Sequence, residues 1–332
     1  MTMAAPPLSA DERAPDGDGR IRDAGGDDIL ISIVIATYRR EDMLSEILGA
    51  LLPQVRGRAA EVIVVDNCPD AGTRTLVEGQ RQPEVIHLHE PRSGVVHARN
   101  RGVAAARGTY VLFLDDDEVP CSDWFDSWMR QADGRTDMGF GRIVPRLLSP
   151  CPEDLRAQVE RHFSRDMGRR TGDDLADRWA YLGTGNAMFH KARCLGDAGP
   201  FDPRFNATGG EDVWLIAGKV KQGRSLVWNH EALVEELVPA SRMTLAYLRG
   251  RRFNQGRLRC ILMYGNGGLS GLVKVLIWMG FGALQLITCQ SAAMLASILA
   301  PRRRADFLCG ASGGAGKLLW WRKSATARYS NG

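Results

Sequence analysis

TYVLFLDDDE, residues 109–118, is the stretch of sequence that decides the fold. A run of apolar residues at 110–114 leads directly into four adjacent carboxylates at 115–118. An apolar run of this length is typical of a strand buried on both faces of a parallel sheet. Four like charges in a row repel one another, so the cluster either faces water or holds a cation.

Strand and helix signals alternate along the chain before this stretch. Buried-strand runs occupy residues 29–36, 61–67 and 84–90, and helical spacing occupies 41–52, where Pro53 marks the expected end, and 94–108. This alternation predicts an α/β fold with a Rossmann-like, mostly parallel sheet flanked by helices. Ligands of such folds bind at the carboxyl ends of the strands, which is where residues 37–40, 66–67 and 115–118 lie. No GxGxxG follows the first strand, which disfavours a dinucleotide-binding domain.

The composition is that of a globular protein with one basic end. The chain has 332 residues, and its seven cysteines form no CxxC pair, which indicates reduced thiols in a cytoplasmic setting. Residues 1–29 are rich in Ala, Pro, Gly and Asp and are interpreted as a disordered leader. Residues 240–332 contain 14 Lys and Arg but one acid, so this part carries a net charge of +13. We therefore expect it to bind something anionic, either nucleic acid or an anionic membrane surface.

An uncharged run at residues 275–300 favours the membrane over nucleic acid. It is 26 residues long, whereas about 20 suffice to cross a bilayer, but several polar residues interrupt it and basic residues flank both of its ends. A single span would leave basic residues on both sides of the membrane. We therefore predict a helix or helical hairpin that lies in, or re-enters, the cytoplasmic face. The alternative is a buried helix that closes the catalytic domain.

The position of the acidic cluster favours a cation over a solvated loop. Oxygen ligands suit hard ions such as Mg²⁺ or Mn²⁺, which proteins commonly share with substrate phosphates. The residues therefore predict a divalent cation between the protein and a diphosphate.

Six motifs in order resemble the inverting family 2 glycosyltransferases of GT-A fold. They are SIVIATYRR, VIVVDN, GVVHARNRG, FLDDDE, GTGNAMF and GGEDVWL, spread over residues 31–256, and the later VEELVPASRMTLAYLRGRRFNQG is similar to the bacterial branch that makes succinoglycan-type exopolysaccharides. The resemblance implies a GT-A catalytic domain at 30–240, with a nucleotide-binding half at 30–120 and an acceptor half at 121–240, and a basic, apolar membrane-associating region at 241–332. It implies a glycosyltransferase of hexosyltransferase type on the cytoplasmic face of the bacterial inner membrane.

The resemblance also assigns roles to single residues. On the donor side it implies that the nucleotide sugar is bound by Thr37, Tyr38, Arg40, Asp66, Arg99, Asp115, Asp116 and Glu236. It implies that Asp117, with Asp115 near it, binds the Mn²⁺ or Mg²⁺ ion, whereas Glu118 is expected to face water. The general base would be Asp212, supported by Glu211, and Gly183, Gly185 and Asn186 would line the acceptor side.

The chemistry requires the same roles. Negative charge builds on the diphosphate as it leaves the sugar, and a divalent cation and nearby arginines stabilise it. The acceptor hydroxyl is a poor nucleophile, so a carboxylate must take its proton as it attacks the opposite face of the sugar and inverts the anomeric centre. The expected substrates are a nucleotide-diphospho-sugar and a saccharide linked to polyprenyl diphosphate, with no nucleic acid.

Several alternatives remain open. The fold also suits a nucleotidyltransferase or a non-catalytic subunit of a polysaccharide assembly complex. Asp66 and Arg99 could each form only a structural salt bridge, and Asp212 could serve only as the cap of its helix. The sequence does not show which of Glu235 and Glu236 lies near the diphosphate. His87 and His89 share one face of a strand, but neither His97 nor any other residue supplies a third metal ligand in register, so the histidines are interpreted as structural. ASGGAGKL, residues 311–318, departs from a phosphate-binding loop and is interpreted as a flexible turn before LLWWRK, whose tryptophans are expected to contact the membrane.

Overall fold

The computed structural model describes residues 29–70, 72–80, 84–197, 199–206, 208–265 and 267–322. Nearly all of the predicted leader, residues 1–28, and the basic residues beyond 322 lie outside this part of the chain.

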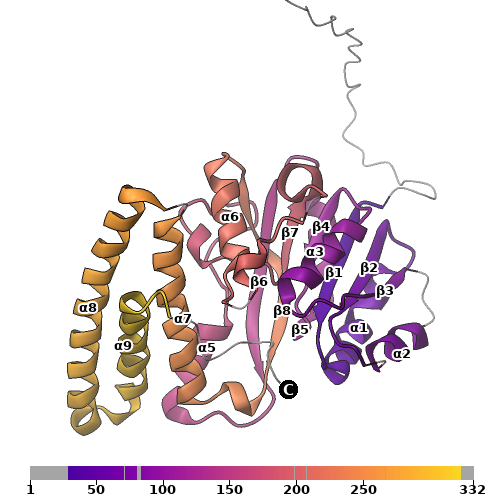
Figure 1. Cartoon of the computed structure of the whole chain (residues 1–332). Coiled ribbons are helices and arrows are strands. Elements are labelled where there is room, and N and C mark those ends of the chain that lie inside the picture. Colours follow the sequence, from indigo (N-terminus) through magenta and orange to yellow (C-terminus); the bar gives the residue numbers. More distant parts are fainter. Residues whose placement is uncertain are drawn as a thin grey trace, which may run out of the picture.

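A mixed eight-stranded sheet forms the centre of the protein, in the order β3-β2-β1-β4-β7-β6-β8-β5 (Figure 1). Strands β1 to β4 are parallel to one another, β7 is antiparallel to β4 and β6, β8 is parallel to β6, and β5 is antiparallel to β8. The predicted α/β fold with its mostly parallel sheet is thereby confirmed. The strands are β1 Ile31–Thr37, β2 Ala60–Asp66, β3 Val85–His89, β4 Tyr110–Phe113, β5 Glu118–Pro120, β6 Met138–Leu147, β7 Ala187–His190 and β8 Leu226–Val238.

Helices cover both faces of the sheet, and the alternation of side chains along β1 shows why. Ile31, Ile33 and Ile35 belong to the core formed with α1 and α4, while Val34 belongs to the core formed with α3 and α6 on the opposite face. Each face thus carries its own apolar layer, which accounts for the continuous β-branched run. The helices of this body are α1 Glu41–Val55, α2 Gly72–Gly79, α3 Val95–Ala105, α4 Trp124–Gln131, α5 Glu153–Phe163 and α6 Glu211–Lys221.

Helix α1 does not end at Pro53, as the sequence predicts, but continues to Val55. Proline lacks an N–H and usually stops a helix within the following turn. Here Val55 is buried in the core, and the N–H of Arg56 still donates to the carbonyl of Leu52. Burial of Val55 and this last hydrogen bond compensate for the hydrogen bond that Pro53 cannot donate.

Three C-terminal helices form a bundle beside the sheet: α7 Leu245–Tyr264, α8 Gly268–Leu299 and α9 Arg304–Leu318 (Figure 1). The bundle shares a third apolar core with α5, in which Val159 and Phe163 lie against Leu248 of α7 and Cys309 of α9. Helices α7 and α9 therefore join the bundle to the body, with α8 outermost.

The Gly-rich stretch at 311–318 lies inside α9, so the prediction of a flexible turn there is wrong. The glycines let α9 approach its neighbours closely. A Cβ on Gly316 would lie 2.0 Å from the carbonyl oxygen of Phe253 in α7, and one on Gly314 would lie 2.6 Å from the carbonyl oxygen of Gly282 in α8. Packing across all three helices offsets the low helix propensity of glycine.

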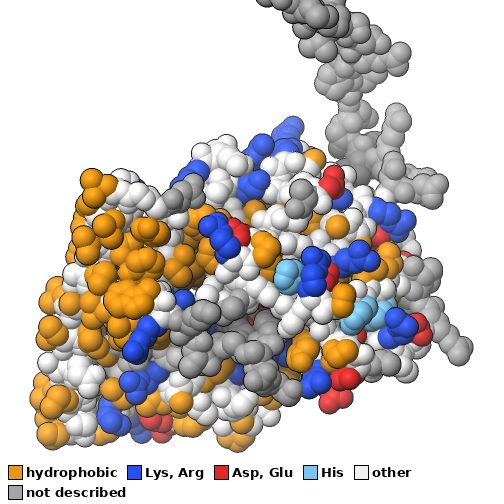
Figure 2. Space-filling model, in the orientation of Figure 1, with side chains coloured by type: hydrophobic (Ala, Val, Ile, Leu, Met, Phe, Trp, Pro, Cys, Tyr) orange, Lys and Arg blue, Asp and Glu red, His pale blue; other side chains and the backbone are white. Residues whose placement is uncertain are grey.

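Helix α8 exposes most of its apolar side chains. It is long and apolar enough to cross a membrane, and only 11% of its most apolar window is buried. In Figure 2 hydrophobic side chains gather over α8 on the left of the molecule. The alternative of a buried helix that closes the catalytic domain is therefore wrong. Together with α9, which returns along it after residues 301–303, α8 forms a helical hairpin.

Alanine substitutions at two glycines, one packed and one exposed, test the packing of α9. Gly316→Ala should lower the free energy of unfolding by about 1–3 kcal/mol, because the added methyl group overlaps Phe253. Gly280→Ala in α8 meets nothing within 4 Å and should raise it by up to about 1 kcal/mol through helix propensity. Chemical denaturation of both purified variants measures the difference. Equal effects of the two substitutions would contradict the close packing.

Candidate active site

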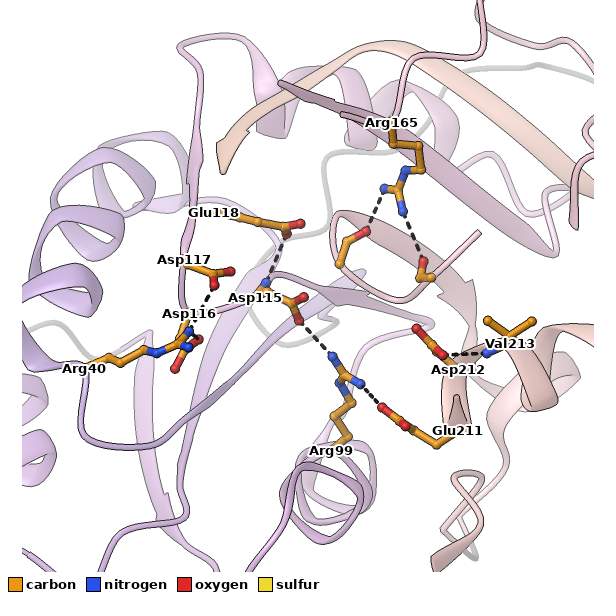
Figure 3. A network of polar contacts seen from close by, with 12 residues as sticks. Arg40, Arg99, Asp115, Asp116, Asp117, Glu118, Arg165, Glu211, Asp212 and Val213 are labelled. Carbon is orange, nitrogen blue, oxygen red and sulfur yellow. Dashed lines mark hydrogen bonds and ion pairs between the residues drawn. The ribbon is translucent and has the colours of Figure 1, made fainter. Parts of the chain in front are cut away.

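The acidic cluster lies just beyond β4, and most of it is buried (Figure 3). Asp116, Asp117 and Glu118 are 2%, 7% and 2% exposed, whereas the side chain of Asp115 is 40% exposed. The expectation that Glu118 faces water is therefore wrong. Glu118 begins β5 and accepts a hydrogen bond from the N–H of Asp115, so pairing of β5 with β8 carries its side chain inward.

Arginines from distant parts of the chain balance these charges. Arg40, which follows β1, donates to Asp116 Oδ1 at 2.5 Å and to Asp117 Oδ2 at 3.0 Å. Arg242 donates to the same oxygen of Asp117 at 2.7 Å. Arg242 was not predicted as a site residue, although it belongs to the VPASR segment that resembles the bacterial branch.

Burial makes the cluster costly when it is fully ionised. Burial, together with the neighbouring charge of Asp117, raises the pKa of Asp116 to about 6 against the opposing charge of Arg40. Burial, reinforced by Asp115, also raises the pKa of Glu118 well above its ordinary value, while Arg165 opposes the shift. A cation at this point would stabilise the ionised carboxylates.

Arg99 of α3 connects the cluster to a second acidic pair far away in the sequence. It donates to Asp115 Oδ1 at 2.9 Å and to Glu211 Oε1 at 2.6 Å (Figure 3). Glu211 and Asp212 begin α6. The structure therefore brings the FLDDDE and GGED motifs into one site, and the salt bridge considered for Arg99 exists as the bridge between them.

Two glycines with positive φ shape the turn that presents Asp212. Gly209 and Gly210 have φ values of 69° and 98°, a region that favours glycine. The N–H of Val213 donates to Asp212 Oδ1 at 2.7 Å. A Cβ on Gly183 would lie 2.9 Å from Asp212 Oδ2, so the GTGN loop lies against this carboxylate.

The backbone of the GTGN loop lies against the acidic cluster, and a buried side chain of the loop anchors it to the core. A Cβ on Gly185 would lie 2.5 Å from Glu118 Oε1 and 2.9 Å from Asp115 Oδ2. Asn186 is 0% exposed, accepts from Trp124 and Trp128, and donates to two backbone carbonyls. Its side chain therefore does not line the acceptor side as predicted but supports the loop from within the core.

Arg165 is a second supporting residue, and the sequence analysis missed it. Its guanidinium is buried and donates to the backbone carbonyls of Gly141, Gly183, Gly185 and Asn186. Burial lowers its pKa to about 10, although Glu118 opposes that shift. No local sequence pattern distinguishes this arginine, because its partners are backbone atoms of distant segments.

The ends of β1 and β2 form the other side of the site. Thr37 and Asp66 pair in the parallel register, and both are buried. Asp66 Oδ1 accepts from the N–H of Cys68, and Oδ2 lies 3.6 Å from His87 Nε2. Tyr38 is partly exposed beside Arg39, which has the positive φ of 50° that is uncommon for a residue other than glycine.

The structure separates the two adjacent glutamates of β8. Glu235 pairs with Arg146 at 3.1 Å, while Glu236 lies opposite Glu118 in the sheet and 3.7 Å from Arg242. Of the two, only Glu236 thus belongs to the acidic cluster.

The donor atoms of this cluster suit a hard divalent cation. In the described part of the chain no three His, Cys, Asp or Glu side chains form a ready-made metal site. Mg²⁺ is commonly bound by one or two carboxylates with substrate phosphates as further ligands. Asp115 and Asp117 fit a site of this kind, because both supply carboxylate oxygens and the side chain of Asp115 is 40% exposed and so open to a substrate phosphate.

Substitution of Arg165 tests how the GTGN loop is held. Arg165→Met should lower the free energy of unfolding by about 3–5 kcal/mol, because it leaves buried acceptors and Glu118 without their counter-charge. Arg165→Lys should cost less, since it keeps the charge but not the planar fork. Thermal unfolding measures the stability of both variants, with Arg156→Gln at an exposed position as the control. A stability of Arg165→Met equal to that of the control would contradict this role.

Known proteins resemble this chain over much of its length. Residues 32–192 match the family model described as Glycosyl transferase family 2. The chain is 31% identical to the succinoglycan biosynthesis protein ExoM of Rhizobium meliloti over 242 residues, which cover 68% of this chain and 73% of that protein. It is also 31% identical to the pre-mycofactocin glycosyltransferase of Mycobacterium tuberculosis over 61% of this chain and 42% of that protein.

Solved structures share the fold. The mannosyltransferase PcManGT of Pyrobaculum calidifontis, solved with GDP-Man and Mn²⁺, superposes with a TM-score of 0.55 at 18% identity and covers 88% of both chains. TarS residues 1–349 of S. aureus, solved with UDP, give 0.52 at 18% identity over 76% of this chain and 70% of that one. The predicted family and enzyme class are confirmed. The chain belongs to glycosyltransferase family 2.

Proposed function

We propose that this glycosyltransferase moves a sugar from a nucleotide-diphospho-sugar to a hydroxyl of a lipid-linked saccharide, with inversion, in the assembly of a cell-surface polysaccharide. The observation that carries the proposal is the bridge made by Arg99 between Asp115 and Glu211. It joins an acidic cluster suited to a diphosphate and its cation to the carboxylate pair that can supply a base. The exopolysaccharide relative ExoM supports the kind of product.

The donor is held by the ends of β1, β2 and β4. Thr37, Tyr38 and Asp66 bind the nucleoside, Asp115 and Asp116 position its ribose and diphosphate, and Glu236 lies near the diphosphate. Arg40 and Arg99 now pair with carboxylates. As negative charge builds on the leaving diphosphate, both can share hydrogen bonds with it and stabilise that charge.

Asp117 and Asp115 hold the divalent cation, Mn²⁺ or Mg²⁺. When bound, this ion supplies positive charge that stabilises the leaving diphosphate. Arg242 and Arg40, which pair with Asp117, orient this carboxylate before the ion and donor arrive. Glu118, the last member of the cluster, lies against Gly185 of the GTGN loop.

Asp212 takes the proton of the acceptor hydroxyl. Its Oδ1 is held by the N–H of Val213, and its Oδ2 lies against Gly183 of the GTGN loop. Glu211, fixed by Arg99, keeps the turn in place. A single base that assists attack on the face opposite the leaving group produces inversion of the anomeric centre.

The C-terminal bundle supports association with a membrane. Residues 241–332 carry its basic charge, and α8 presents an apolar face that water would not favour. We assign residues 30–240 to catalysis and place the protein on the cytoplasmic face of the bacterial inner membrane, where nucleotide sugars and lipid-linked saccharides meet. The acceptor is a saccharide linked to polyprenyl diphosphate.

Removal of the base tests the catalytic assignment. Asp212→Asn keeps the side-chain volume but cannot accept the proton, so transfer from a panel of radiolabelled nucleotide sugars to membrane-extract acceptors should fall about 10²–10⁴-fold. Binding of the labelled donor should stay unchanged, and exposed Asp123→Asn should retain wild-type transfer. Full transfer by Asp212→Asn would exclude this residue as the base.

Metal removal tests the cation site. EDTA should abolish transfer, and added Mn²⁺ should restore it. Mn²⁺ should also raise the melting temperature of the wild-type protein in the presence of a nucleoside diphosphate, because ligands that bind the folded state stabilise it. Asp117→Asn should need at least about tenfold more Mn²⁺ for the same shift, the loss expected for one charged contact. An unchanged Mn²⁺ requirement would contradict the role of Asp117.

A further inference from the structure

A cavity opens on the bundle between α8 and α9. Its volume is about 530 Å³, and its lining is largely apolar. Trp278, Phe281 and Leu284 form its apolar wall, and the remaining lining residues are Gln285, Thr288 and Lys317. None of these lining residues belongs to the nucleotide-binding half of the site.

Two cationic side chains meet at the indole ring of Trp278. The Nζ of Lys317 lies 5.5 Å from the ring centroid, and the Cζ of Arg259 lies 5.4 Å from it. Among the residues that the structure describes, neither cation forms an ion pair with a carboxylate. Two positive charges beside an apolar cavity favour a ligand that is anionic at one end and apolar at the other.

The glycines of α9 explain how a lysine reaches this position. Lys317 Nζ donates to Gln285 Oε1 of α8. A Cβ on Gly282 would lie 2.8 Å from the Cβ of Lys317, so only glycine at 282 lets the two helices meet here. The GGAGK stretch thus places a cation against an apolar wall by helix packing.

The cationic edge of the cavity lies next to the acceptor side of the active site. Arg259 also lies over the ring of Tyr181, with its Cζ 5.6 Å from the ring centroid. Tyr181 comes two residues before Gly183, which packs against Asp212. The neighbour of Arg259 in α7, Leu258, lies where a Cβ on Gly210 would meet it at 2.3 Å. Side-chain contacts therefore run from the cavity to both loops that present the base.

The apolar end of the cavity faces the exposed side of α8. Phe281 and Leu284 are 57% and 61% exposed, and they continue into the apolar face that Figure 2 shows over α8. A hydrocarbon chain that leaves a membrane along this face would meet exposed apolar side chains of α8 beside the cavity. A free nucleotide or inorganic phosphate would not need such a wall.

We propose that this cavity binds the lipid anchor of the acceptor, with isoprenoid units against Trp278, Phe281 and Leu284 and the diphosphate between Arg259 and Lys317. The inference rests on the proposed function and deepens it, because it specifies how a polyprenyl-diphosphate-linked saccharide enters the site. The sugar then extends past Tyr181 toward Asp212.

Binding of farnesyl diphosphate to the full-length chain in detergent micelles tests this site. It should bind at least about tenfold more tightly than farnesol, which lacks the charge, or inorganic diphosphate, which lacks the chain. Arg259→Gln, Lys317→Met and Trp278→Leu should each weaken binding about tenfold, the loss expected for one charged or stacked contact. Lys274→Gln, an exposed lysine of α8 outside the cavity, should bind like the wild type.

The results for the remaining variants and competitors distinguish a specific lipid site from a general lipid contact. Wild-type binding by Arg259→Gln and Lys317→Met, or equal competition by phosphatidylglycerol, would overturn the proposal and leave a general lipid contact. Should Lys317→Met lose its cooperative melting transition, Arg259→Gln decides alone. Sugar transfer to membrane-extract acceptors separates the two levels of inference: a wild type that binds farnesyl diphosphate but transfers no sugar would count against the proposed function and not against the lipid site.

Discussion

The mutual repulsion of the carboxylates at residues 115–118 is the constraint on which the rest of the structure depends. Three of them, Asp116, Asp117 and Glu118, lie buried just after β4, and no neighbour in the sequence can neutralise them. The counter-charges come from Arg40 after β1, Arg99 of α3 and Arg242 after β8. Strand order and helix packing bring these segments together, so the charged site depends on the tertiary fold.

One of these arginines, Arg99, also connects the two acidic groups of the site. Because Arg99 contacts both Asp115 and Glu211, the cluster suited to the diphosphate and the pair that can supply the base are held in one network. Buried Arg165 does the same for the GTGN loop, through backbone carbonyls rather than carboxylates. Preorganisation of this kind lowers the cost of arranging charge during the reaction.

Helix α7 extends this organisation into the C-terminal bundle. Leu258 packs on Gly210, while Arg259 reaches Tyr181 on one side and Trp278 on the other. Close packing of the glycines in α9 holds α8 at the edge, with its apolar face outward. The bundle is thus attached directly to the loops beside Asp212, which connects the exposed apolar face of α8 to the site through side-chain contacts.

The sequence by itself determined the buried strands, the position of polar residues at their ends and the motifs that identify the family, because all of these depend on local patterns of apolar and charged residues. Only the tertiary structure decided the environment of Glu118, the internal role of Asn186, and the parts played by Arg165 and Arg242. It also turned the Gly-rich stretch at 311–318 into a packed helix. The reason is the same in each case: burial and hydrogen-bond partners are set by contacts between segments far apart in the chain, on which local sequence carries no signal.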